Sequence, residues 1–518
     1  MNMTKWGATS SRQAGAFCRV LAVLLVGWSI PMLAASEDDW LVPLGLPPQA
    51  APKRISGGEG VPPLPLPATP IRRTERKREP KAPQLIGKIV WGESSEYRYA
   101  SGETRQIADW NLCPDDLAQL MRKAGRWFGL SYGTQAVSLN AFDGDPQATP
   151  VLFLSGVRTL RLTEAQVDLL RNYVVRGGMI VLDSLAGSPY FLASARELAA
   201  RLIPGEPLRP IPLDHPIFSM LADARTVEVP RRPETTTPVF EGVYVGSRIA
   251  CLVSPIGLGC GWDDHDVPLL EKAVFYDVDS ANRLGVNLVA YAIGYAEAAR
   301  TEARPELFGM LDEKRPTDEL VFAQIKHGGA WNVHPGGAAS LLRRLRHETS
   351  LGVSLKRLAV DPARETLDAF PFLYMEGLDD FVWDDASVVA LRHFLARGGT
   401  LVINNGLGLA TFDHAVRREL KRLLPANDLA PVPTDHPLLS ACRPMGAVGY
   451  SPAAMKQNPT LVGVTLEAVT INGDLRIIYS PYDVACAWSG CDYPLALAYD
   501  GVSGIELGMN VLMYAMTH

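Results

Sequence analysis

A long internal repeat constrains the fold of this chain more than any other feature. Trp110-Asn111 recurs as Trp331-Asn332, and the register holds without a gap until Asp214-His215 recurs as Asp435-His436, at a spacing of 221 residues throughout (331 − 110). Solenoid repeats are far shorter, roughly 20–50 residues. The repeat therefore predicts two tandem copies of one domain, which we expect over 85–300 and 320–518, joined by a linker over 301–319. Each copy is long enough to bury a hydrophobic core.

The composition is that of an ordinary globular protein. The 518 residues are 47% hydrophobic and 20% charged, with a formal net charge of −6. This mild acidity, together with the lack of a basic stripe in either copy, argues against a nucleic-acid partner. The sequence has no glycine-rich phosphate loop, no zinc-binding helix motif and no Gly-x-Ser-x-Gly motif, so we expect no cofactor and no metal.

The N-terminus has the pattern of an export signal. Lys5 and Arg12 precede an apolar run over 20–28, and small residues follow near 34–36. This pattern predicts a secretory signal peptide over 1–36, or an uncleaved membrane anchor in its place. Proline and charged residues dominate 37–84, which predicts a disordered linker. We therefore expect a periplasmic or secreted protein, tethered to the membrane if the signal stays uncleaved.

Six of the seven cysteines follow the expected signal. Export would place them in an oxidising compartment, where disulfides persist. None has the Cys-x-x-Cys spacing typical of zinc sites. Proximity in sequence suggests the pairs Cys251–Cys260 and Cys486–Cys491, and buried free thiols are the alternative.

Strands and helices alternate in both copies. The apolar run at 179–182 and its counterpart at 400–403 are typical of buried strands, and the helix before each ends at Arg-Gly-Gly, where glycine can adopt a left-handed conformation. Thr163-Glu164-Ala165-Gln166 fits a capping box at the start of one such helix. The first copy also carries extra residues over 92–109. Buried strands separated by helices predict a parallel sheet covered on both faces.

The motifs of each copy follow one another in a specific order. A strand, a helix, Arg-Gly-Gly and a second strand precede Phe-x-x-x-x-Arg, His-Pro, Ser-Pro with Cys-x-Trp, and Gly-x-Asn with a following tyrosine. This order resembles DUF4159, a bacterial domain family of unknown function, over almost everything after the linker. The resemblance implies kinship with the class I glutamine amidotransferase fold and the ThuA-like proteins. It thus implies an α/β fold of two tandem flavodoxin-like domains, whose ligands would lie outside the carboxyl ends of the strands.

The resemblance also bears on catalysis. In the amidotransferases a nucleophilic cysteine follows the strand that comes after the Gly-Gly pair. That position holds Asp183-Ser184 in the first copy and Asn404-Asn405 in the second. Neither pair provides the thiolate that amide hydrolysis requires, so glutaminase activity is not expected.

Two polar residues of the first copy are candidates for catalysis. Asp183 follows a buried strand, where catalytic carboxylates often lie, but its side chain could equally cap the next turn. His215 could act as a general base or metal ligand, or it could bond the backbone at the start of a helix. If Asp183 works as an acid or base, the second copy is degenerate, because Asn404 lacks its charge and basicity.

Other polar and aromatic residues at repeated positions are candidates for ligand binding. An aromatic face suits a sugar, and carboxylates, amides and imidazoles offer hydrogen bonds; packing and capping are the alternatives. The candidates are Trp110, Asn111, Asp214, Trp331, Asn332, Asn404, Asp435 and His436. The cluster Asp263-Asp264-His265-Asp266 is rich in metal ligands, but its counterpart over 489–492 is not, so a solvated loop is favoured there.

We expect an exported protein that binds rather than catalyses. Its partner would be a protein of the cell envelope or a polysaccharide, held for example between the two copies. The alternative is a hydrolase of carbohydrate or cell-wall material that uses Asp183 and His215. Because an enzyme needs both residues on one open cleft, their placement separates the two hypotheses.

Overall fold

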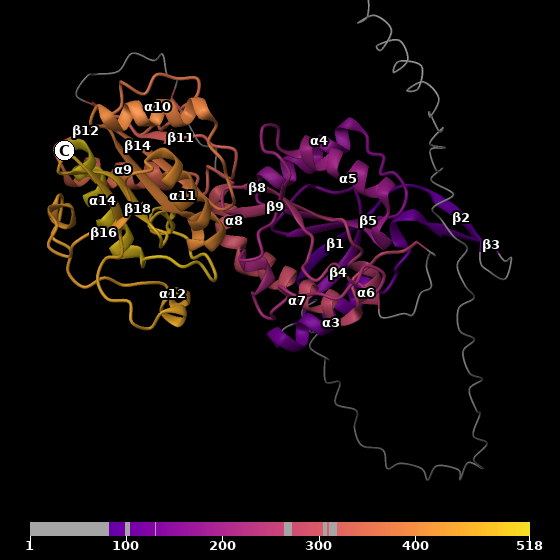
Figure 1. Ribbon diagram of the computed structural model, residues 1–518. Helices are drawn as coiled ribbons and strands as arrows, with labels where there is room; N and C mark the ends of the chain where they lie inside the picture. Colours follow the sequence, from indigo (N-terminus) through magenta and orange to yellow (C-terminus); the bar gives the residue numbers. More distant parts are fainter. Residues whose placement is uncertain (1–81, 99–103, 130, 264–271, 304–307, 310–318) are drawn as a thin grey trace, which may run out of the picture.

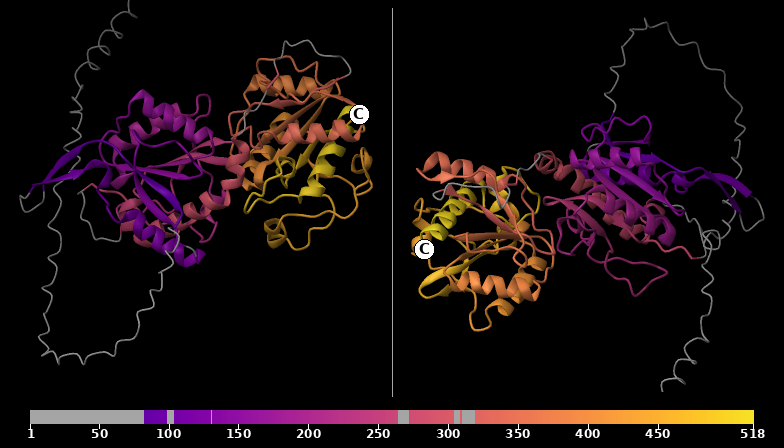
Figure 2. Two further views of the ribbon diagram at one scale, coloured as in Figure 1. Left: turned by 180° about the vertical axis from the view of Figure 1, so that it is seen from behind. Right: turned by 90° about the horizontal axis from the view of Figure 1, so that it is seen from above.

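A computed structural model describes residues 82–98, 104–129, 131–263, 272–303, 308–309 and 319–518. These residues form two domains that lie side by side, domain one ending at α8 and domain two beginning at β10 (Figures 1 and 2). The expected signal over 1–36 and nearly all of the expected linker over 37–84 lie outside the described residues. Within the described ranges, no helix combines the length and the apolar character that crossing a membrane requires.

Domain one is built on a seven-stranded sheet with the order β4-β1-β5-β6-β9-β8-β7. The strands from β4 to β9 pair in parallel, and β8 and β7 continue the sheet antiparallel at one edge. A hairpin of β2 and β3 projects from the side of domain one that faces away from domain two (Figure 1). The strands are β1 (Gln84–Val90), β2 (Ser94–Arg98), β3 (Thr104–Ala108), β4 (Gly133–Ser138), β5 (Val151–Gly156), β6 (Met179–Ser184), β7 (Arg209–Pro210), β8 (Glu241–Val245) and β9 (Arg248–Ser254).

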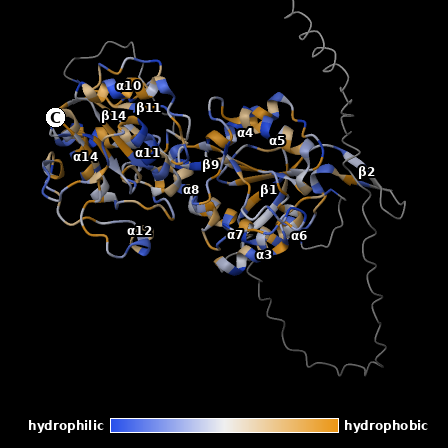
Figure 3. Ribbon diagram, in the orientation of Figure 1, coloured by the Kyte–Doolittle hydropathy of each residue, from blue (hydrophilic) through white to orange (hydrophobic). Residues whose placement is uncertain are grey.

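Helices cover both faces of this sheet. α3 and α7 pack on one face, against Phe153 and Val181, whereas α4 and α5 pack on the other, against Leu152 and Leu182. Because neighbouring strand residues point to opposite faces, a strand covered on both sides must be apolar throughout (Figure 3). The helices are α3 (Asp116–Phe128), α4 (Glu164–Val175), α5 (Pro189–Leu202), α6 (Gly259–Asp263), α7 (Val278–Gly294) and α8 (Ala296–Glu302), with short 3-10 turns η1 (Asp109–Asn111), η2 (Leu185–Gly187) and η3 (Pro216–Phe218).

Domain two repeats this architecture with the strand order β13-β11-β14-β15-β18-β17-β16. Its strands are β10 (Glu319–Leu320), β11 (Ala323–Ile325), β12 (Gly352–Val353), β13 (Leu358–Val360), β14 (Phe372–Gly377), β15 (Thr400–Asn405), β16 (Ala430–Pro431), β17 (Glu467–Ile471) and β18 (Asp474–Ser480). Its helices are α9 (Gly337–Glu348), α10 (Asp385–Ala396), α11 (Ala410–Leu423), α12 (Pro452–Gln457), α13 (Ala485–Ser489) and α14 (Gly501–Thr517), with η4 (Gly406–Gly408) and η5 (Pro437–Ser440). The predicted fold class is confirmed: two tandem α/β domains have mostly parallel sheets between helices, as in flavodoxin-like folds.

Local sequence signals set the helix ends as predicted. Thr163 Oγ1 accepts a hydrogen bond from the Gln166 backbone N–H, and the Gln166 side chain bonds back to the Thr163 N–H, so the capping box forms. Gly177 and Gly398, in the Arg-Gly-Gly motifs, adopt φ angles of 109° and 96° after α4 and α10. Such positive φ angles favour glycine, which explains the repeated motif.

The asparagine of each Gly-x-Asn motif lies inside the last long helix and clamps a loop to it. Asn287 Oδ1, on α7, accepts hydrogen bonds from the N–H groups of Leu221 and Ala222 at 2.8 and 2.9 Å. Asn510 Oδ1, on α14, accepts from the N–H groups of residues 442 and 443 at 2.8 Å each. The same clamp therefore docks the segment after the Asp-His-Pro motif in both domains.

Domain one covers the carboxyl edge of the sheet of domain two. Both carboxylate oxygens of Asp214 accept hydrogen bonds from Thr411, at 2.8 Å from its N–H and 2.7 Å from its hydroxyl. The Tyr295 hydroxyl, at the end of α7, donates to Pro494 O at 3.1 Å. The domain-one residues of this interface come from β7, the loop after it, the β8–β9 turn, the end of α7 and α8, whereas the domain-two residues follow strands.

Apolar packing continues across the same interface. The core of domain one extends to Val333, Leu378 and Leu407 of domain two, which are fully buried. Gly246, in the β8–β9 turn, has a φ of 62°, and a Cβ atom there would lie 2.8 Å from Pro335 Cδ. Glycine thus permits this close approach, and the two domains share a packed contact.

Candidate functional site

A buried polar cluster lies at the carboxyl ends of the strands of domain one. Lys88, on β1, lies with its Nζ 2.8 Å from Asp116 Oδ2, on α3, and donates to Cys113 O at 2.7 Å. Lys88 also contacts Asn111 Oδ1 at 3.2 Å. A Cβ added to Gly259 would lie 3.2 Å from both Asp116 Oδ2 and Asp183 Oδ2, so the two carboxylates flank the same glycine.

Asp183 lies at the end of β6 and caps the start of α6. Its side chain is 0% exposed, and it accepts hydrogen bonds from the Leu258 N–H at 2.9 Å and the Gly259 N–H at 2.8 Å. Burial raises the pKa of Asp183 to about 7, although both N–H groups oppose this shift. Burial likewise raises the pKa of Asp116 to about 6, against the attraction of Lys88. Both carboxyls are therefore poised to titrate near neutrality.

His215 lies apart from this cluster, in an apolar and aromatic surrounding. Its side chain is buried, Nδ1 accepts from the Ile217 N–H at 3.2 Å, and the ring packs on Tyr244 and Tyr291. Burial lowers the pKa of His215 to about 3, so the ring is neutral at physiological pH. Within the described residues, His215 and Asp183 make no hydrogen bond or ion pair with each other. The structure does not bring the two catalytic candidates together on one open cleft, and each is buried in a separate structural role.

The aspartates of the two Asp-His-Pro motifs make different contacts, whereas the histidines make similar ones. Asp214 binds Thr411 across the domain interface. Its counterpart Asp435 is exposed and makes no hydrogen bond or ion pair with the described part of the chain. His436 repeats the local role of His215: its Nδ1 accepts from the Leu438 N–H at 3.2 Å, and its ring packs on Tyr514.

Domain two has a second buried cluster that the sequence analysis missed. His334 Nε2 lies 2.7 Å from Asp483 Oδ2 and 4.0 Å from Cys486 Sγ, and the thiol lies 3.1 Å from the same carboxylate oxygen. All three side chains are buried, and their nitrogen, oxygen and sulfur atoms lie within 4.8 Å of one another. This donor set is one that zinc accepts. Asp483 Oδ2 also accepts a hydrogen bond from the Leu407 N–H at 2.6 Å. Because the backbone already occupies this oxygen, an ion pair between His334 and Asp483 is favoured over a zinc site.

The ionisation of this cluster supports the ion-pair interpretation. Burial lowers the pKa of His334, but Asp483 and other carboxylates raise it to about 9 overall. Burial raises the pKa of Asp483, yet the charge and hydrogen bond of His334 bring it down to about 2. Burial raises the pKa of the Cys486 thiol well above its usual value. At neutral pH the cluster therefore holds an imidazolium, a carboxylate and a neutral thiol.

The repeat itself held the signal for this cluster. His334 stands 221 residues after Cys113 (334 − 113), at the same place behind the Trp-Asn pair, and Cys486 occupies the place of Cys260 in the Cys-x-Trp motif. Domain one thus places two cysteines at this edge, where domain two places a histidine and a cysteine. Asn404 completes the comparison: it takes the position of Asp183, and its Nδ2 donates to Asp483 Oδ1 at 2.9 Å.

A family model described as "Domain of unknown function (DUF4159)" matches residues 99–293 and 321–516. The chain belongs to the DUF4159 family. The two matches fall in domain one and domain two, so the DUF4159 unit is present as two tandem copies. Among curated proteins, no similar sequence was found.

Neither disulfide suggested by sequence proximity forms in the DUF4159 copies. None of the six cysteines after the expected signal forms a disulfide in the described part of the chain. Cys260 Sγ lies 3.9 Å from Cys113 Sγ, not beside Cys251, because Cys251 is in the middle of β9 whereas α6 carries Cys260 back over the sheet edge. Cys491 Sγ lies against Ser489 O. Sequence proximity did not predict these positions, because the chain turns between the two cysteines of each suggested pair and places their thiols apart.

The Trp-Asn pairs of the two DUF4159 copies differ in their surroundings. Trp110 and Asn111 pack beside Lys88, whose Nζ lies 5.9 Å from the Trp110 ring. Trp331 and Asn332 instead line a cleft of about 220 Å³ between the two domains. Residues from both domains line this interdomain cleft: Glu206, Tyr244, Glu302, Trp331, Asn332 and Pro335 are among them. Of the Asp263–Asp266 cluster, only Asp263 lies in the described residues, buried at the end of α6.

Proposed function

We propose that this chain is an exported, non-catalytic binding protein of the bacterial cell envelope, and that it takes one sugar unit of a polysaccharide in its interdomain cleft. The observation that carries the proposal is the placement of Trp331 and Asn332, the repeat's aromatic and amide pair, in a cleft between the copies. An aromatic face packs against the C–H groups of a sugar ring, and an amide can form hydrogen bonds with hydroxyl groups. Asn332 Oδ1 already accepts one hydrogen bond, from Arg357 Nη2 at 2.7 Å.

The size and polarity of the interdomain cleft support this ligand class. Its volume of about 220 Å³ is below the roughly 300–1,000 Å³ of sites for drug-sized ligands, so it suits one small unit of a longer chain. The Trp331 ring is half-buried, with Lys326 Nζ 5.7 Å from its centroid. Glu206, from domain one, adds a carboxylate that can accept hydrogen bonds from hydroxyl groups.

The buried clusters support binding over catalysis. Both carboxylate oxygens of Asp183 accept hydrogen bonds from backbone N–H groups, and His215 lies apart from Asp183. His334 and Asp483 neutralise each other in the interior of domain two. Groups held in this way have their hydrogen-bond partners inside the protein, and none of them lines the interdomain cleft. We also propose that the kinship with the class I glutamine amidotransferase-like and ThuA-like folds is real, since the sheet order and helix placement agree with it.

Titration calorimetry of the full chain with β-1,4-linked N-acetylglucosamine oligosaccharides and soluble cell-wall fragments tests the proposal. Trp331→Ala is expected to abolish binding, because it removes the aromatic face of the cleft. Trp110→Ala is the matched control, since it removes the counterpart tryptophan and should leave affinity unchanged. If no saccharide binds, or if both variants bind as the wild type does, the cleft is not a sugar site.

A hydrolase that uses domain one is the second candidate, and one observation favours it. Asp116 and Asp183 have raised pKa values, flank the same glycine and lie near Lys88, and such perturbed carboxyls gather at active sites. Release of reducing sugar from cell-wall material, lost in Asp183→Asn with the melting temperature kept, would support hydrolysis. Loss of stability without any wild-type activity would leave Asp183 as a cap.

A further inference from the structure

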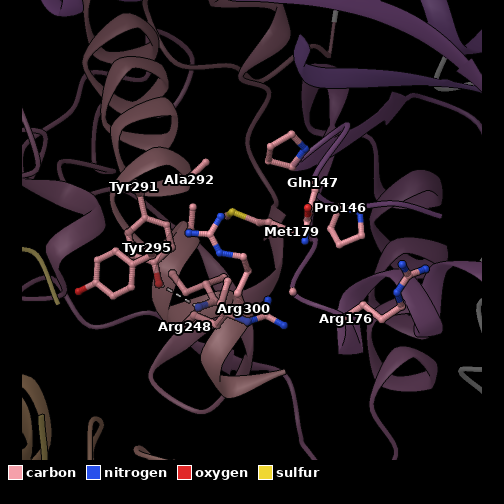
Figure 4. Close-up of a pocket in the computed structure, with 14 residues that line it drawn as sticks. Pro146, Gln147, Arg176, Met179, Arg248, Tyr291, Ala292, Tyr295 and Arg300 are labelled. Carbon is pink, nitrogen blue, oxygen red and sulfur yellow. Dashed lines mark hydrogen bonds between the residues drawn. The ribbon is translucent and has the colours of Figure 1, made fainter. Parts of the chain in front are cut away.

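A second cavity, of about 280 Å³, opens at the opposite edge of the domain-one sheet, where β5, β6 and β9 begin (Figure 4). Three arginines line it: Arg176 after α4, Arg248 at the start of β9 and Arg300 on α8. Figure 4 shows Arg176 across the cavity from Tyr291 and Tyr295. No described residue that lines this arginine cavity carries a carboxylate.

Arg248 forms the buried floor of the arginine cavity. Its side chain is about 2% exposed and donates to Gly178 O at 3.0 Å and to Val174 O at 2.5 Å. These bonds hold the end of α4, but the Nε–H of Arg248 is buried without a hydrogen-bond partner. An unsatisfied buried donor costs roughly 1–3 kcal/mol, and more when it is charged. A ligand that accepts a hydrogen bond there would remove this cost.

The two outer arginines are exposed and only partly paired. Arg176 donates to Gly144 O at 3.1 Å, and Arg300 makes no hydrogen bond or ion pair with the described part of the chain. Two acidic groups lie nearby, and neither lines the cavity, although Glu302 attracts Arg248. Glu302 bonds the Ser247 hydroxyl at 2.7 Å, and Asp145 accepts from the Gln147 N–H at 3.0 Å.

Domain two provides an internal comparison, because its arginines at this edge are neutralised. Arg397, the counterpart of Arg176, forms an ion pair of 2.6 Å with Asp368. The position of Asp368 corresponds to Gln147 in domain one (368 − 147 = 221). Domain one thus lacks the carboxylate that neutralises the same arginine in domain two.

The strand register shows a second substitution of the same kind. Val245 pairs with Arg248 in the β8–β9 hairpin, as Ile471 pairs with Asp474 in the β17–β18 hairpin. Asp474 lies 2.6 Å from Arg476. At both positions where domain two has an aspartate, domain one has a neutral or cationic residue, so its cavity keeps an excess of positive charge.

We propose that the arginine cavity binds a small anion, a carboxylate or phosphate group attached to an apolar or aromatic body. Guanidinium groups match the two oxygens of a carboxylate or phosphate and pair with them strongly when partly desolvated. The apolar body would lie against Met179, Ile249 and Tyr291, which line the remainder of the cavity. This site is independent of the interdomain cleft and of the function proposed for it.

Titration calorimetry of the full chain with phenyl phosphate, benzoate and inorganic phosphate, at low salt, tests this proposal. Removing Arg248 would free the end of α4, so Gln147→Asp and Arg300→Ala are the informative variants, since both positions are exposed. Each is expected to weaken binding of phenyl phosphate or benzoate at least tenfold. Gln147→Asp would weaken binding because the new aspartate would pair with Arg176, as Asp368 pairs with Arg397 in domain two.

Arg397→Ala is the matched control and should leave the affinity unchanged, as should Trp331→Ala in the interdomain cleft. Preference for phenyl phosphate over benzoate, or the reverse, identifies the anionic group. Equal affinity for inorganic phosphate would exclude a role for the apolar wall. The proposal is overturned if neither aromatic anion binds saturably, or if Gln147→Asp and Arg300→Ala both bind as the wild type does.

Discussion

At the scale of single residues, Asp183 and Asn404 show how one position does the same work with different chemistry. Asp183 accepts from the Leu258 and Gly259 N–H groups before α6. Asn404 Oδ1 accepts from the Val484 N–H at 2.9 Å before α13. Both side chains therefore fasten a sheet strand to the start of the same short helix, and the change from Asp to Asn leaves the cap intact.

We expect Asp183→Ala to destabilise the protein by roughly 2–4 kcal/mol, because two buried N–H groups lose their acceptor. Asp183→Asn should cost less, since it keeps one acceptor oxygen. Urea unfolding at pH 7 measures both variants. The pKa of Asp183 is raised to about 7 in the fold, so wild-type stability should fall relative to Asp183→Asn as the pH rises from about 4 to 7. A flat difference over that range would contradict the assigned protonation state.

His334 should make stability depend on pH in a separate window. Its folded pKa of about 9 lies above the unfolded value of about 6.5, so its contribution is complete below pH 6.5 and is lost as the pH rises through 9. The free-energy gap between wild type and His334→Gln should narrow by an amount on the order of 3 kcal/mol across that window. His436→Gln should show no such narrowing, because partial burial lowers the pKa of His436 and its ring forms no ion pair within the described residues. Denaturation at several pH values gives both results.

The sequence identified the candidate residues more readily than their roles. Asp183 and His215 were predictable as polar residues at element ends, and the capping alternatives agree with the contacts seen. The His334–Asp483 pair was missed because Asp483 has no polar counterpart in domain one, where Gly257 occupies its place in the Ser-Pro motif. Burial of a charged residue depends on a distant partner, and local patterns do not reveal such a partner.

At the scale of elements, the Asn287 and Asn510 clamps stabilise the contact between the last long helix and a loop. Asn287→Ala leaves two N–H groups without an acceptor, so we expect a loss of roughly 2–4 kcal/mol. Asn510→Ala should cost a similar amount in domain two. Asn282→Ala, on the same helix α7, is the control: among the described residues, Asn282 Oδ1 accepts a hydrogen bond only from Lys123 Nζ, at 2.9 Å. Equal urea midpoints for Asn287→Ala and Asn282→Ala would disprove the clamp.

Strands and helix ends were predictable at this scale because they follow from local chemistry. The apolar run at 179–182 and the capping box at Thr163 both appear where expected. The extra residues over 92–109 were recognised as an insertion, but their folding into β2 and β3 was not predicted. This hairpin belongs to one copy only, so the repeat offered no second sequence to compare with it.

At the scale of the whole molecule, Asp214 fastens the two domains together, whereas its counterpart Asp435 is exposed. Asp214→Ala removes two hydrogen bonds to a charged acceptor, each worth roughly 1.5–3 kcal/mol. We therefore expect the Thr411 amide to exchange its hydrogen at least tenfold faster in this variant. Asp435→Ala is the matched control and should leave exchange at Thr411 unchanged. Equal exchange in both variants would show that this contact does not hold the interface.

The number of domains was predictable, but their docking was not. The repeat imposes the same strands on both copies. The contact between the copies also needs a partner that differs, since Asp214 recurs as Asp435 but Thr411 corresponds to Tyr190. Thr411 and Tyr295 contribute to the interface in one copy only. A comparison of the copies therefore predicts what they share, which is the fold, and leaves out the surface by which they meet.

The packing of domain one on the carboxyl edge of domain two also has a direction. The two domains meet through different surfaces, head to tail, and a contact of this kind leaves one unmatched end on each partner. At the unmatched end of domain one, the β2–β3 hairpin projects from the edge where a preceding copy would otherwise dock (Figure 1). We expect the hairpin to obstruct the docking of a further domain by this same head-to-tail contact.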